Sequence, residues 1–164
     1  RGPKNDEYEW WRLHRPSIKY IFDSQEKIVV PYRAEHNRFA YDDKQFFNDG
    51  GDIRAIIVKE NSKYSIKFLL GLLNSNMLDW YYGFIGKQKG CAREYFNKPL
   101  SEIPIFKATQ KQQQPIIDLV DKILAAKKEN PQADTSEWEK EIDRLVYELY
   151  GLTEEEVKVV EGRE

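Results

Sequence analysis

Short apolar runs separated by turn-forming residues occupy the early part of the chain, a pattern typical of β-strands. Four runs are expected to form strands: residues 18–22, 27–30, 38–41 and 53–58. The last run contains mostly β-branched and apolar residues, which favour strands, and it follows the turn signal Asn-Asp-Gly-Gly-Asp at residues 48–52. The front of the chain is therefore expected to contain a small mixed β-sheet.

Longer apolar segments follow and predict helices. Ser62 or Ser65 can cap a helix over residues 66–73, and a second helical segment starts at Asn76. Three glycines between residues 83 and 98 indicate an irregular loop after these helices.

Beyond residue 108 the apolar residues take the spacing of amphipathic helices. One helix is expected over about residues 115–128. The next helix carries an apolar stripe that must pack on something: Trp138, Ile142, Leu145, Val146 and Leu149. Capping signals mark the helix ends: Ser136 with Glu139, Thr153 with Glu156, and Gly151.

These elements predict an α+β fold in two parts. Residues 1–108 would form a small mixed-sheet domain with packed helices, and residues 109–164 would form a C-terminal helical hairpin. The first part has 18 Lys and Arg against 14 Asp and Glu (+4), and the second has 8 against 14 (−6). Such an asymmetry predicts two surfaces with different partners.

Composition excludes several classes of protein. The 164 residues are 40% hydrophobic and 33% charged, without an apolar run of the ~20 residues that a membrane span needs. A single cysteine, Cys91, excludes a disulfide framework and a cysteine-rich zinc site. The chain starts with Arg-Gly-Pro and its only methionine is Met77, so we expect a piece of a longer polypeptide.

The residue patterns of common enzyme sites are missing from the sequence. There is no Gly-rich phosphate loop, no Gly-x-Ser-x-Gly motif and no histidine in a triad or metal-binding pattern. Cys91 has cations nearby but no partner base. We therefore expect neither a catalytic residue nor a metal ligand in this chain.

Two segments, residues 31–44 and 86–98, combine cations with amide and aromatic side chains. Arg and Lys bind phosphates, Arg can pair with guanine, and Asn and Gln can pair with adenine in the major groove. The candidate contacts are Tyr32, Arg33, Asn37, Arg38, Tyr41, Lys44, Lys87, Gln88, Lys89 and Arg93. On composition alone, solvated surface loops explain both segments equally well.

Most other aromatic residues fit a hydrophobic core better than a contact surface. We expect core positions for a set of six: Trp10, Trp11, Phe22, Phe68, Trp80 and Phe84. Tyr32 and Tyr41 are flanked by polar residues and are the better contact candidates.

A series of motifs in chain order resembles one known family. The motifs are residues 27–33 and 37–43, a helix ending in Leu-Leu-Asn-Ser at 72–75, the basic loop 86–93, Leu-Ser-Glu-Ile-Pro-Ile at 100–105, and the tail 147–161. Together they are similar to the TaqI-like C-terminal specificity domain of adenine-specific DNA methyltransferases and fused restriction–modification enzymes.

The resemblance implies a DNA sequence-recognition domain that is not catalytic by itself. Its partners would be double-stranded DNA and the catalytic methyltransferase domain of the same parent chain, which would flip an adenine and methylate it with S-adenosylmethionine. No cofactor is expected in this fragment, because the Asn-Pro-Pro-Tyr signature and the Gly-rich cofactor motif are absent. The parent would act in the cytoplasm, away from membranes, and would either only methylate DNA or also cleave it.

The resemblance also implies a division of labour. The two basic segments would face DNA, as phosphate or base contacts that the sequence does not separate. The acidic hairpin after residue 108 would dock on the catalytic domain or space the modules. Asn74 and Ser75 are interpreted as closing the helix before them.

The alternative is a protein–protein interaction module, in which the apolar stripe over residues 138–149 is the working surface and the basic loops are incidental. The arrangement of the cations separates the two hypotheses. Binding to one groove requires that the following residues gather on one face: Arg33, Arg38, Lys87, Lys89 and Arg93.

Overall fold

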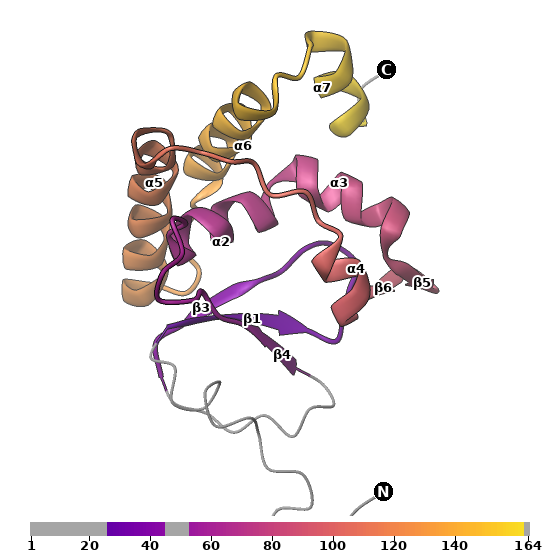
Figure 1. The fold of residues 1–164 in the computed structure, drawn as a ribbon, viewed down its shortest axis with the longest axis horizontal. Coiled ribbons are helices and arrows are strands. Elements are labelled where there is room, and N and C mark those ends of the chain that lie inside the picture. The colour runs from indigo at the N-terminus through magenta and orange to yellow at the C-terminus, as the bar shows by residue number, and fades with distance from the viewer. Residues whose placement is uncertain (1–25, 45–52, 163–164) are drawn as a thin grey trace, which may run out of the picture.

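Two small antiparallel sheets lie beside a set of helices in the computed structural model, which describes residues 26–44 and 53–162 (Figure 1). The expected α+β class is confirmed. The expected strand at 18–22 and the expected turn at 48–52 lie outside the described residues. No helix in the described part of the chain is both long enough and apolar enough to cross a membrane.

The first sheet has β1 (Lys27–Pro31) at its centre, between β3 (Ala40–Asp42) and β4 (Ile53–Ile56). Ile28 and Val30 are two positions apart on β1, so both point to the same side of the sheet. Both are fully buried, and helix α2 (Ile66–Asn74) contacts this strand. The three strands predicted in this range are confirmed, and β3 starts two residues later than expected. After Tyr32 the same stretch of chain continues as β2 (Arg33–Ala34), which belongs to the second sheet.

The second sheet has the order β2-β6-β5, and its hairpin replaces the irregular loop expected over residues 83–98. Helix α3 (Asn76–Ile85) ends at Gly86, where a Cβ would lie 2.5 Å from the Tyr82 ring. Strands β5 (Lys87–Lys89) and β6 (Ala92–Glu94) then pair around Gly90, whose φ of +64° favours glycine. The short helix α4 (Asn97–Ser101) follows. The loop prediction was therefore wrong: Gly83 lies inside α3, Gly86 caps its end, and Gly90 forms the turn of the hairpin.

Two serines set the boundaries of α2 and α3. The Ser65 hydroxyl, rather than that of Ser62, accepts a hydrogen bond from the Lys67 amide at 3.2 Å and caps α2. The Ser75 hydroxyl donates to the Leu72 carbonyl at 2.7 Å and accepts from the Leu78 amide, so it closes α2 and caps α3.

The C-terminal helices are α5 (Gln110–Glu129), α6 (Ser136–Tyr150) and α7 (Glu154–Val160). Helix α5 begins five residues before Pro115, because Thr109 and Gln112 form a capping box that the sequence analysis overlooked. The expected box at the start of α6 is wrong: Thr135 is the cap residue and Ser136 is already helical. The expected stop at Gly151, with φ +70°, and the expected capping box at the start of α7 are confirmed.

The hydrophobic core continues across the domain boundary expected at residue 108. Its members in three helices are Phe68 and Leu72 of α2, Ile116 and Val120 of α5, and Ile142 and Val146 of α6. Helix α2 is thus packed between the first sheet and the α5–α6 hairpin. The apolar stripe of α6 is used in this internal packing, and the boundary at residue 108 does not separate two cores.

Gly71 allows the close approach of α2 to α5. A Cβ at this position would lie 2.6 Å from Ile116 Cγ2 and 3.2 Å from Val120 Cγ2. At Gly83, which is also inside a helix, a Cβ would lie 3.6 Å from Arg93 Nη1, an ordinary contact.

Alanine at these two glycines should therefore have opposite effects on stability. We expect Gly71→Ala to lower the free energy of unfolding by about 1–2 kcal/mol, because overpacking outweighs the gain in helix propensity. Gly83→Ala should leave it unchanged or raise it by up to about 1 kcal/mol. Urea unfolding measures both, and a Gly71→Ala chain as stable as Gly83→Ala would contradict the packing described.

Candidate nucleic-acid interface

One row of charged side chains crosses the second sheet. Glu94 of β6 pairs in register with Arg33 of β2 on one side and with Lys87 of β5 on the other. Arg33 Nη2 lies 2.6 Å from Glu94 Oε1, and Lys87 Nζ lies 3.0 Å from Glu94 Oε2. The Arg33 and Lys87 side chains remain 45% and 65% exposed, whereas Glu94 is buried beneath them. The row therefore presents its cations outward.

The two cations lower the pKa of Glu94. Hydrogen bonds from Arg33, and then from Lys87, lower the pKa of Glu94 to about 2, against its ordinary value of 4.5. The carboxylate therefore stays ionised and fixes both cations at neutral pH.

Aromatic rings lie on the same side of the sheet. The Tyr32 hydroxyl donates to Glu94 Oε1 at 3.1 Å, and the Tyr32 ring meets the Phe96 ring edge to face at 5.9 Å. Arg54 of β4 lies over both rings, 5.7 Å from the centroid of Tyr32 and 5.4 Å from that of Phe96. Its Nε donates to Asn97 Oδ1 at 3.2 Å.

We call the set Arg33, Arg54, Lys87 and Lys89 the cationic face. Lys89 is exposed and, two residues after Lys87, lies on the same side of β5. Arg54 was missed by the sequence analysis because it belongs to the strand 53–56, far along the chain from both basic segments. Arg54 pairs with Val30 of β1, so pairing the two predicted strands would have shown that Arg54 lies near the second sheet.

Arg93 was expected to face DNA, but the structure buries it on the opposite side of β6. Side chains alternate along a strand, so Arg93 points away from the side on which Glu94 lies. Its Nε and Nη2 donate to the Glu35 carbonyl at 3.0 and 2.5 Å, and its Nη1 and Nη2 donate to the Asp79 carbonyl and Oδ1, each at 2.6 Å. Arg93 therefore binds groups inside the protein, and the expectation that it contacts DNA was wrong.

Asp79 of α3 is the partner of Arg93. Besides Arg93, its carboxylate accepts from the Asn37 amide at 2.6 Å, and its Oδ2 lies 3.0 Å from His36 Nδ1. The pair of Arg93 and Asp79 thereby ties residues 35–37 to both α3 and the hairpin.

Asn37 and Gln88 also make internal contacts. Asn37 Nδ2 donates to the Leu73 carbonyl at 2.7 Å, and its Oδ1 accepts from the Tyr95 hydroxyl. Gln88 is exposed, but its Nε2 donates to the Gly83 carbonyl at 2.9 Å. The amide groups of both candidates are thus engaged within the chain.

The remaining candidates lie away from the cationic face. Arg38 is exposed beside a pocket described below. The Tyr41 hydroxyl donates to Glu26, and burial, with Glu26 adding to it, raises the pKa of Tyr41. Lys44 is exposed after β3, where its carbonyl accepts from Lys27 Nζ. The structure thus brings Tyr32, Arg33, Lys87 and Lys89 together, and it does not bring Arg38, Tyr41 or Lys44 to them.

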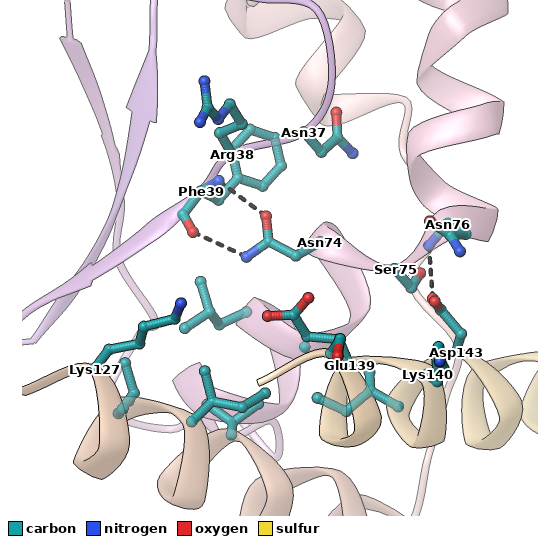
Figure 2. Close-up of a pocket in the computed structure, with 17 residues that line it drawn as sticks. Asn37, Arg38, Phe39, Asn74, Ser75, Asn76, Lys127, Glu139, Lys140 and Asp143 are labelled. Atoms are coloured by element: carbon teal, nitrogen blue, oxygen red, sulfur yellow. Dashed lines mark hydrogen bonds between the residues drawn. The ribbon is translucent and has the colours of Figure 1, made fainter. Parts of the chain in front are cut away.

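Asn74 joins two of the motifs that carry the family resemblance. Its Oδ1 accepts from the Phe39 amide and its Nδ2 donates to the Phe39 carbonyl, each at 2.9 Å (Figure 2). The end of α2 thereby fixes the chain that enters β3. This contact supports the structural interpretation of Asn74 and Ser75.

A pocket of about 800 Å³ lies between this junction and the α5–α6 hairpin (Figure 2). Leu70, Val120 and Ile142 line it together with charged residues of both signs, among them Lys127 and Glu139. Asp143 accepts from the Asn76 amide at 2.7 Å, and burial raises the pKa of Asp143 to about 6. In the described part of the chain, no group of His, Cys, Asp and Glu is arranged to hold a metal ion.

Sequence comparison identifies the family of this chain. The TaqI-like C-terminal specificity domain matches residues 4–105, more than half of the chain. The chain belongs to this family. The type II methyltransferase M.HindII of Haemophilus influenzae is 31% identical over 131 residues, covering 73% of this chain and 25% of that protein. The type II methyltransferase M.HincII of Haemophilus influenzae is 31% identical over 115 residues, covering 63% and 23% respectively.

The matched region defines which parts of the TaqI-like specificity domain the structure shows. It includes both sheets and helices α2 to α4, and it ends before α5. The chain spans about a quarter of the length of the two methyltransferases. The motif series is thus confirmed up to residue 105, and the resemblance of the tail stays a prediction.

The low pKa of Glu94 predicts how stability depends on pH. A carboxyl whose pKa is lower in the folded chain stabilises the fold above its ordinary pKa, and this contribution is lost as the pH falls from about 4.5 toward 2. We therefore expect the stability advantage of the wild type over Glu94→Gln to shrink between pH 6 and pH 3 in urea unfolding. Glu129→Gln, at an exposed carboxylate of α5, is the control, and a gap that stays constant for Glu94→Gln would contradict the ion-pair row.

Proposed function

We propose that this chain is the DNA sequence-recognition domain of an adenine-specific DNA methyltransferase and that it is not catalytic by itself. Membership of the TaqI-like specificity family supports the proposal, and the relatives are type II methyltransferases. The structural observation that carries it is the cationic face, where four cations gather with one carboxylate.

The β5–β6 hairpin is the element that would enter the DNA. A major groove accommodates a two-stranded β-ribbon. All residues from Lys87 to Cys91 are exposed, and the turn at Gly90 keeps the tip narrow. Lys87 and Lys89 would contact phosphates, which attract them without sequence preference.

We expect bases to be read by side chains that are held in one orientation, and Arg33 is such a side chain. Arg33 is held by Glu94 and stacked on Tyr32, with its Cζ 4.9 Å from the ring centroid. Arg33 Nε and Nη2 donate to Glu94 Oε1, and the remaining N–H groups of the guanidinium would donate to the acceptors of guanine. Arg54 would support Tyr32 from behind. Arg38, Tyr41 and Lys44 remain candidates for contacts to the flanking backbone.

The parent enzyme would supply the chemistry. Both relatives are about four times as long as the region matched, so S-adenosylmethionine and the reacting adenine would be bound outside this chain. The chain itself contains neither the Asn-Pro-Pro-Tyr signature nor the Gly-rich cofactor motif. The segment after residue 108, which is acidic as a whole, would face the catalytic domain or space the modules. The enzyme would act on cytoplasmic DNA.

The protein-interaction alternative is not favoured by the structure. Ile142 and Val146, at the centre of the stripe proposed as its working surface, are buried against the chain's own helices.

Salt dependence tests the proposal on the isolated chain. We expect weak duplex binding whose log affinity falls linearly with log salt, and a slope reduced by about 0.9 for each phosphate contact removed in Lys87→Ala or Lys89→Ala. Fluorescence anisotropy with a labelled duplex measures the slope. Arg33→Ala should instead weaken the preferred sequence about tenfold or more and relax one position of the target.

The matched controls are Lys111→Ala and Lys128→Ala, which remove exposed cations from α5. They should leave affinity and slope unchanged. If they weaken binding as much as the hairpin variants, the cationic face is not the DNA-binding surface.

A further inference from the structure

The aromatic residues in the described part of the chain lie in different environments. Phe68 is fully buried, as expected, whereas Trp80 and Phe84 of α3 are 38% and 71% exposed and contradict their expected core positions. Tyr32 and Phe96 are half-buried and lie among the cations of the cationic face. The contacts of these two rings bear on how DNA would be recognised.

Arg54 is the cation that the two rings share. Its Cζ lies 5.7 Å from the centroid of Tyr32 and 5.4 Å from that of Phe96, within the range of about 6 Å over which a guanidinium is attracted to an aromatic ring. Arg33 also lies over the Tyr32 ring, and Lys87 Nζ lies 5.6 Å from the Phe96 centroid. Arg54 is therefore connected to Arg33 through one ring and to Lys87 through the other.

Arg54 approaches the rings from the buried side of the first sheet. Residues opposite each other in an antiparallel pair point to the same side, and Arg54 lies opposite Val30, which is fully buried. Arg54 Nε donates to Asn97 Oδ1, while Arg54 Nη1 is buried and has no hydrogen-bond partner among the described residues. A guanidinium is weakly hydrated and stacks on aromatic faces, so the contact with the rings offsets this burial.

Direct contact with a phosphate is the other role open to a cation on this face. The Arg33 and Lys87 side chains are 45% and 65% exposed, so they can meet a phosphate oxygen. Arg54 is half-buried, with its Nε bonded inside the chain and its Nη1 closed off from solvent. The geometry therefore favours a role in which Arg54 orders its neighbours.

We propose that Arg54 is a positioning residue: it holds the Tyr32 ring against which Arg33 is oriented, and so sharpens base reading without touching DNA. This inference rests on the proposed function and deepens it, because it divides the cationic face into residues that contact DNA and one that orders them. Without Arg54, the Tyr32 ring would have fewer contacts and Arg33 would take more orientations. Arg33 would then discriminate less between bases, while the charges that meet phosphates would stay in place.

The experiment measures discrimination between two duplexes. Selection from a randomised duplex defines the sequence that the chain prefers, and the position relaxed by Arg33→Ala defines the second duplex, which differs only there. The strength of cation–π contacts implies that Arg54→Met should lower the affinity ratio of the two duplexes roughly 2- to 30-fold. Its salt slope should equal that of the wild type, since no phosphate contact is lost. The ratio does not depend on the fraction of chain that is folded, so a destabilised variant stays informative.

Two further variants identify how Arg54 acts. Arg54→Lys keeps the charge but not the guanidinium plane, so it should lose discrimination as Arg54→Met does. Arg54→Met in the Arg33→Ala background should change the ratio no further, because the two residues act through one series of contacts. Lys111→Met, which removes an exposed cation of α5, is the control and should change neither the ratio nor the slope.

A salt slope reduced by about 0.9 in Arg54→Met but not in Arg54→Lys would identify a phosphate contact and overturn the positioning role. Full discrimination in Arg54→Lys would overturn it too, as would a further loss when Arg54→Met is added to Arg33→Ala.

Failure of this inference is distinguishable from failure of the proposed function. If duplex binds with the expected dependence on Lys87 and Lys89 but Arg54→Met keeps the wild-type ratio, the positioning role is wrong and the recognition domain stands. If no duplex binds at any salt concentration, both proposals fall.

Discussion

The ion pair between buried Arg93 and half-buried Asp79 is the constraint on which the arrangement of the candidate interface depends. Arg93 belongs to the hairpin, Asp79 to α3, and both bind the turn at residues 35–37. Removing the Asp79 carboxylate would destabilise the fold, because it would leave the buried guanidinium of Arg93 without this counter-charge. The pair also fixes which side chains of β6 point to each side of the second sheet. With Arg93 turned inward, Glu94 lies on the other side of β6, where Arg33 and Lys87 join it.

A second link fixes the chain just before β3. Asn74 at the end of α2 binds both the amide and the carbonyl of Phe39, so it acts as a strand neighbour would. Asn37 returns a bond to the same helix end at Leu73. The two segments, which both belong to the motif series, are 35 residues apart in sequence and are joined by this contact. These bonds hold the backbone of the basic segment 31–44 in place, while the side chains of Arg33, Arg38 and Lys44 stay exposed.

Local signals in the sequence predicted most of the fold. The β-branched run starting at Ile53, the serine before α2 and Gly151 after α6 each act through neighbouring backbone, so their effects can be read without tertiary contacts. The hairpin at residues 87–94 was missed because glycines mark both tight turns and irregular loops. The close packing of α2 on α5 was not predicted, because Gly71 reveals a close helix contact only when its partner Ile116 is known.

The site was less predictable than the fold for a related reason. A run of cations identifies a basic surface, but the alternation of side chains along a strand decides which cations reach it. Lys87 lies on the side of the second sheet that carries Glu94, whereas Arg93, one residue before Glu94, points to the other side. Arg54 joins the face only through the pairing of β4 with β1. Trp80 and Phe84 look like core residues by composition, and only the helix orientation set by Leu78 and Tyr82 turns them outward.

Amide hydrogen exchange with and without duplex DNA tests the central claim most directly, because it maps the contact surface residue by residue. At low salt and saturating duplex, we predict new protection over residues 31–36 and 87–94 and none over α5 and α6. Protection confined to α5 and α6, with the hairpin unchanged in a chain that binds DNA, would contradict the account.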